Sequence, residues 1–77
     1  MITAIAPSPK QIGARIRIQL ERHDLTVPKA AAACGLSQPS FETYLYGKNS
    51  PGASALAGLA HGLRCSADYL LFGMPKP

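Results

Sequence analysis

Residues 25–48 read LTVPKAAAACGLSQPSFETYLYGK, and this stretch decides the fold. Thr26 and Ser37 are favoured N-cap residues, and each precedes a run that can form a short helix. Gly35 suits the left-handed backbone conformation that ends a helix, so a tight turn should join the two helices. Small polar residues occupy the exposed start of the second helix. A rigid helix pair of this layout is typical of proteins that place one helix in a DNA groove.

Helical spacing of apolar residues predicts further helices on both sides of this pair. One helix should begin at Ser8 and Pro9, an N-cap followed by a proline in the first turn, and end near residues 23–24. A fourth helix should follow the turn at residues 50–52, and a fifth should span residues 67–72. The apolar residues expected to face the core are Ile12, Ile16, Leu20, Leu36, Phe41, Tyr44, Leu45, Leu56, Leu59, Ala60, Leu63, Leu70 and Leu71. No alternating strand pattern competes, so the sequence predicts an all-α domain of five helices.

The chain divides into an N-terminal arm (1–7), one domain (8–73) and a short C-terminal tail (74–77). Its 77 residues, of which 47% are hydrophobic, are enough for one small domain with a modest core. The formal charge is +4, with eight Lys or Arg against four Asp or Glu. A basic balance favours nucleic acid or an anionic membrane surface as the partner, although a merely soluble basic protein would show the same balance.

Side chains suited to catalysis or metal binding are not grouped in this sequence. It shows no paired carboxylates, no nucleophile beside a base and no phosphate-binding glycine loop, so we expect no enzyme activity, cofactor or small-molecule substrate. Cys34, Cys65, His23 and His61 lack the spacing of zinc ligands. The cysteines are interpreted as small buried thiols, with a disulfide as the alternative. Because the sequence shows no secretory signal and no 18-residue apolar run, we expect a cytoplasmic protein that does not enter membranes.

Four pieces of the sequence occur in the order and spacing of a known family. They are IGARIR at residues 12–17, ACGLSQPSF at 33–41, GKNSPG at 47–52 and LAHGLRCSADYLLFG at 59–73. Over residues 12–73 the chain resembles the phage Cro/repressor type of helix-turn-helix domain, also called the XRE (xenobiotic-response-element) family. The resemblance implies a five-helix, lambda-repressor-like domain whose second and third helices contact double-stranded DNA.

The resemblance also implies which residues contact DNA. Gln38 stands where such proteins often read a base, and a glutamine can bond adenine through two hydrogen bonds. Base contacts are expected from the start of the third helix, namely from Gln38, Pro39, Ser40 and Thr43. Contacts to the DNA backbone are expected from Thr26, Val27, Lys29, Ser37, Tyr46, Lys48 and Asn49. Arg15 and Arg17 either reach the DNA backbone as well or form a solvated face.

Two features of the expected DNA-binding helix pair, residues 26–49, reduce its affinity for DNA. Val27 stands where the family usually has a glutamine that braces a phosphate and the recognition helix, and the valine side chain can do neither. The charges between residues 26 and 49 are those of Lys29, Lys48 and Glu42, which leave a net charge of only +1. Each phosphate contact that is missing lowers the salt dependence of binding by about 0.9 in slope. We therefore expect one copy of the chain to bind a half-site weakly.

Pairing of two copies would offset that weakness. The C-terminal end carries more apolar surface than a short helix can bury, and Tyr69, Phe72 and Met74 are expected to form a homodimer interface. The leading interpretation is a sequence-specific DNA-binding transcriptional regulator, a repressor that binds a palindromic operator as a dimer. The alternative is a protein-interaction or antitoxin-like module with weak DNA binding, which Val27, Leu45 and the low charge of the helix pair favour.

Overall fold

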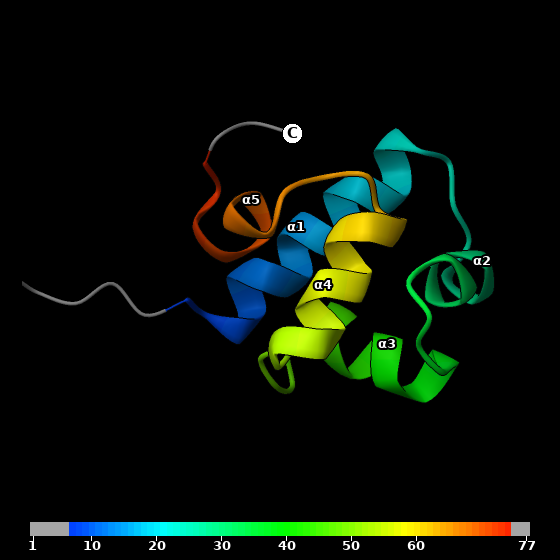
Figure 1. Ribbon diagram of the computed structural model, residues 1–77, viewed down its shortest axis with the longest axis horizontal. Helices are drawn as coiled ribbons and strands as arrows, with labels where there is room; N and C mark the ends of the chain where they lie inside the picture. Colours follow the sequence, from blue (N-terminus) through cyan, green and yellow to red (C-terminus); the bar gives the residue numbers. More distant parts are fainter. Residues whose placement is uncertain (1–6, 75–77) are drawn as a thin grey trace, which may run out of the picture.

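The structure is a computed structural model that describes residues 7–74 of the chain (Figure 1). Its helices are α1 (Pro9–Arg22), α2 (Val27–Ala33), α3 (Gln38–Leu45), α4 (Ala53–Gly62) and α5 (Ala67–Phe72). No strand occurs among residues 7–74, so the prediction of an all-α domain with five helices is confirmed. The predicted arm, apart from Pro7, and the predicted tail, apart from Met74, lie outside the described residues.

Side-chain caps define where most of the helices begin. The hydroxyls of Ser8, Thr26, Ser37 and Ser66 each accept a hydrogen bond from the backbone N–H three residues later, at 3.0–3.4 Å. Each bond satisfies an N–H group that has no partner within the helix, so α1, α2, α3 and α5 begin where capping residues stand. Helix α4 begins after Gly52, which provides no side-chain cap.

The turn between α2 and α3 depends on Gly35. Its φ is +69°, in the left-handed region that side chains with a Cβ rarely adopt. The backbone N–H groups of Gly35 and Leu36 donate to the carbonyls of Ala32 and Ala31, which closes the end of α2. This places Ser37 directly at the start of α3, so the angle between the two helices is set within a few residues.

The core forms where α1 packs against α3 and α5, while α4 packs against α2 and α5 (Figure 1). Among the predicted core residues, Ile12, Ile16, Phe41, Leu59, Leu63 and Leu70 are fully buried, and Leu20 and Leu45 are almost fully buried. The remaining predicted core residues are only half-buried and pack against the edge of the core: Leu36, Tyr44, Leu56, Ala60 and Leu71. The core is small, because five short helices enclose little space.

Glycines allow the closest contacts between helices. A Cβ added to Gly13 of α1 would lie 2.5 Å from the Leu45 carbonyl oxygen, so α1 and α3 touch backbone to backbone. A Cβ on Gly62 of α4 would lie 2.6 Å from the Sγ of Cys34, at the end of α2. Any larger residue at these positions would push α3 or α2 away from the core.

Two polar side chains of α1 tie distant elements to it. Arg15 donates from Nη1 to the backbone oxygens of Leu70 and Leu71, at 3.2 and 3.0 Å. Gln19 is fully buried and donates from Nε2 to the oxygen of Leu63 at 3.0 Å, while its Oε1 has no hydrogen-bond partner. Arg15 thus holds the end of α5 and Gln19 holds the end of α4. For Arg15 this internal contact differs from both alternatives that the sequence left open, a DNA-backbone contact and a solvated face.

The cysteines are free thiols in the interior and at its edge. Cys34 is buried and Cys65 is half-buried. Burial raises the pKa of both thiols, and for Cys34 it is the main cause of a rise to about 11. Within residues 7–74, no three His, Cys, Asp or Glu side chains are grouped so that they could hold a metal ion.

Candidate nucleic-acid interface

Helix α3 presents a polar surface on the side away from the core. Phe41 and Leu45 anchor it from within, whereas Gln38, Pro39 and Ser40 are exposed and Thr43 is half-buried. Because residues four apart are neighbours along a helix, Gln38 forms a row with Glu42, and Pro39 forms the next row with Thr43. Of the four predicted base-contacting residues, Gln38, Pro39 and Ser40 therefore form the first turn of α3, and Thr43 lies one turn further along.

Hydrogen bonds within α3 fix the orientation of these side chains. Gln38 Nε2 donates to Glu42 Oε2 at 3.4 Å, and Thr43 Oγ1 donates to the Pro39 carbonyl at 3.0 Å. The Ser37 hydroxyl donates to Ser40 Oγ at 2.9 Å while it caps the helix. The hydroxyl hydrogen of Thr43 is therefore used inside the helix, so Thr43 offers acceptor lone pairs and a methyl group to a partner.

The predicted backbone contacts lie at both ends of the α2–α3 pair. Those that are exposed are Thr26, Lys29, Ser37, Tyr46, Lys48 and Asn49. Val27 is half-buried and packs against the core, so its side chain is unavailable to a phosphate and only its backbone could contribute. Thr26 and Ser37 already use their hydroxyls as caps.

Sequence reasoning missed a cation beside the end of α3. A Cβ on Gly47 would lie 2.9 Å from the Cα of Lys10, so the first turn of α1 packs against the residues that follow α3. Lys10 is exposed there and lies against Gly47, the residue before Lys48, although it is far from both in the sequence. It adds a positive charge to a surface that has a net charge of only +1 in the linear sequence.

Comparison with known proteins identifies the family. A family profile described as "Helix-turn-helix domain" matches residues 11–70, which is most of the chain. The chain belongs to this helix-turn-helix family. Residues 26–49, which contain α2, the turn and α3, are its helix-turn-helix unit, and the predicted assignment to the XRE, phage-repressor type is confirmed.

Solved structures show the same fold. The P22 c2 repressor in complex with a synthetic operator is 27% identical, over 80% of this chain and 94% of that one, with a TM-score of 0.75. The restriction-modification controller protein C.AhdI from Aeromonas hydrophila is 19% identical, over 80% and 94%, with a TM-score of 0.75. The clp gene regulator ClgR from Corynebacterium glutamicum is 20% identical, over 90% and 95%, with a TM-score of 0.73. A search of curated proteins found no match.

The predicted dimer surface of this helix-turn-helix protein needs one correction. Tyr69 is only 7% exposed, because the Ser66 cap sets the start of α5 so that Tyr69 and Leu70 both face the core. Tyr69 therefore belongs to the interior of its own chain and not to an exposed interface. Phe72 and Met74 are 44% and 70% exposed, as an interface between copies would require.

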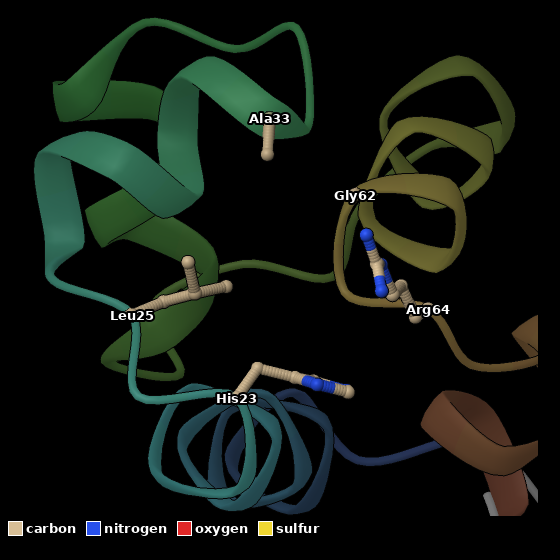
Figure 2. A pocket seen from close by; sticks show the side chains of 5 residues that line it. All are labelled: His23, Leu25, Ala33, Gly62 and Arg64. Carbon is tan, nitrogen blue, oxygen red and sulfur yellow. The ribbon is translucent and has the colours of Figure 1, made fainter.

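A pocket of about 290 Å³ lies elsewhere on the helix-turn-helix domain, lined by His23, Leu25, Ala33, Gly62 and Arg64 (Figure 2). The C-terminal ends of α1, α2 and α4 meet there, and such ends carry partial negative charge. The basic side chains of His23 and Arg64 extend into this space. None of the residues predicted to contact DNA lines the pocket.

No helix among residues 7–74 is long and apolar enough to span a bilayer.

Proposed function

We propose that this protein is a sequence-specific DNA-binding transcriptional regulator that inserts the start of α3 into the major groove. The observation that carries the proposal is the polar, internally hydrogen-bonded surface of α3, anchored from behind by Phe41. Gln38, Ser40 and Thr43 supply donors, acceptors and a methyl group, the chemistry with which proteins read base edges. The P22 c2 repressor, which was solved with its operator, supports the same use of the fold.

The contacts with DNA phosphates come from around this helix. Lys29, Lys48 and Lys10 supply the positive charges, and Asn49 and Tyr46 supply polar groups. With so few charges, one copy binds a half-site weakly, and most of the affinity of a palindromic site comes from two copies bound together. Phe72 and Met74 provide the apolar surface for that pairing, which would set two α3 helices about one DNA turn apart.

The regulator acts as a repressor in this proposal. A dimer that occupies an operator excludes polymerase from the same DNA, and the similarity to the P22 c2 repressor supports this sign of regulation. A regulator of this kind must share a compartment with its DNA, which agrees with the expected cytoplasmic location.

Selection of binding sites from random DNA, followed by fluorescence anisotropy at several salt concentrations, tests the function. We expect selected sites to contain two related half-sites and to bind on the order of 10³-fold or more tightly than random DNA. Equal affinity for selected and random DNA would refute sequence-specific regulation. Sedimentation at micromolar concentration tests the pairing, and a strict monomer that binds a single half-site would refute the dimer.

A protein-interaction module is the second candidate. It is favoured by the apolar Val27 at the start of α2 and by the negative charge of Glu42 on the helix that would enter the groove. Salt-insensitive DNA binding, together with a stable complex with another protein that covers α3, would support this candidate over the regulator.

A further inference from the structure

Glu42 is the one acidic residue of α3, and it lies one helical turn after Gln38. Its Oε2 accepts a hydrogen bond from Gln38 Nε2 at 3.4 Å. Glu42 is half-buried, whereas Gln38 is exposed at the start of the helix. The side chain of Glu42 is therefore the more restricted of the two, and its carboxylate can orient the exposed side chain of Gln38.

The carboxylate dictates which end of the Gln38 amide it meets. An ionised glutamate has only acceptor oxygens, so it can bond the Nε2 hydrogens but would repel Oε1. One Nε2 hydrogen of Gln38 is thereby engaged within α3. The amide can present to a partner only its second Nε2 hydrogen and its Oε1, which is one donor beside one acceptor.

One donor beside one acceptor matches the major-groove edge of adenine but not that of guanine. In the major groove, adenine shows an acceptor at N7 and a donor at N6, which a donor–acceptor pair satisfies completely. Guanine shows acceptors at both N7 and O6, so two donors are needed. A free glutamine could turn both Nε2 hydrogens toward guanine, but Gln38 bound to Glu42 has only one to offer.

We infer that Glu42 is a positioning residue that makes Gln38 select adenine over guanine. The inference rests on the proposed function, since it assumes that α3 lies in the major groove. It also gives a reason for a negative charge on a DNA-reading helix: the charge weakens binding to any phosphate backbone, while the hydrogen bond sharpens the choice of base.

Variants that separate charge from hydrogen bonding test the inference. Glu42→Gln removes the charge but keeps, at the same reach, an amide oxygen that can accept the hydrogen bond from Gln38. Glu42→Ala removes both the charge and the bond. Glu21→Gln is the matched control, because it removes one exposed negative charge from α1, outside the helix-turn-helix unit. Gln38→Ala identifies the base pair at which Gln38 acts, as the pair whose purine preference it abolishes.

The measurement is the ratio of dissociation constants for sites that carry adenine or guanine at that base pair. We expect the wild-type protein to favour adenine by roughly 5- to 150-fold, the range of a good two-bond contact. Glu42→Ala should reduce the ratio toward 1, Glu42→Gln should keep most of it, and Glu21→Gln should leave it unchanged. Glu42→Ala and Glu42→Gln should both bind random DNA more tightly than the wild type, because each removes a negative charge.

The free protein provides a second measurement that needs no DNA. The side-chain amide resonances of Gln38 in NMR spectra should shift in Glu42→Ala and stay in place in Glu21→Gln. Unchanged resonances, or a wild-type base ratio, in Glu42→Ala would overturn the inference and leave the proposed function intact. A wild-type protein without any base preference would overturn both. A loss of selectivity in Glu42→Ala that Glu42→Gln largely restores supports both.

Discussion

The helix-turn-helix unit and helix α5 are held in place by different kinds of contact. Within the unit, the bonds that shape α2 and α3 join residues three to five positions apart, such as those at Thr26 and Ser37. Helix α5 is held from outside by Arg15, which bonds Leu70 and Leu71 across 55 and 56 residues of chain. The surface of α3 that is proposed to contact DNA is therefore shaped by short-range hydrogen bonds. The end of α5 that is proposed for pairing is instead positioned by contacts between distant parts of the chain.

The largest effect is expected where both regions share one core. Phe41 is fully buried, and Phe41→Ala should lower the free energy of unfolding by about 3–5 kcal/mol, through lost burial and the cavity left behind. That is a large part of the stability of a small domain. Urea unfolding measures it. Phe72→Ala removes the same group from a 44% exposed position and should cost far less; equal losses at both sites would contradict this core.

A smaller effect is expected at Cys34, where the end of α2 meets α4. Burial, with Cys65 nearby, raises the pKa of Cys34 from 9.0 to about 11, so the folded state favours the neutral thiol. The stability that this thiol contributes is complete below pH 9 and is lost as the pH rises toward 11. A shift of this size corresponds to about 2–3 kcal/mol.

Urea unfolding of the reduced protein between pH 8 and pH 11 checks the prediction for Cys34. The stability advantage of the wild type over Cys34→Ala should shrink as the pH rises, because the variant has no thiolate to bury. Subtracting the variant removes the contributions of other groups that titrate in this range. Parallel stability curves for the two proteins would show that Cys34 is free to ionise without cost to the fold.

The contact of Arg15 with α5 should have a more local effect. Arg15→Ala removes a charged donor from two carbonyls and should cost about 1–3 kcal/mol. Hydrogen exchange should accelerate first in α5, while the amides of α2 and α3 remain protected. Arg15→Lys keeps the charge but lacks the planar guanidinium, so it should recover only part of the loss. Uniform acceleration across all helices would mean that α5 is not a separate unit of stability.

The smallest effect is expected at Lys10, beside the end of the helix-turn-helix unit. Lys10→Ala should change the free energy of unfolding by less than about 0.5 kcal/mol, as is usual at exposed positions. If Lys10 neutralises a phosphate, the slope of log affinity against log salt should fall by about 0.9. Arg22→Ala, at the opposite end of α1, is the control and should leave the slope unchanged. Identical slopes for Lys10→Ala and wild type would exclude Lys10 from the DNA contact.

Local signals explain why so much of the helix-turn-helix unit could be predicted. The caps at Thr26 and Ser37 and the left-handed Gly35 all act over one turn of helix, so residue type and spacing were sufficient. Tyr69 was assigned wrongly for the opposite reason. Its residue type suits both a core and an interface, and only the packing of α5 on α1 and α4 buries it.

By itself, the sequence determined the helices, their boundaries, the exposed start of α3 and membership of the helix-turn-helix family, because these follow from short-range bonds and periodic burial. Tertiary structure alone decided that Arg15 serves α5, that Gln19 serves the end of α4 and that Lys10 lies beside the end of α3. These contacts join residues far apart in the chain. No local pattern encodes such pairs, since they form only when the whole chain has packed.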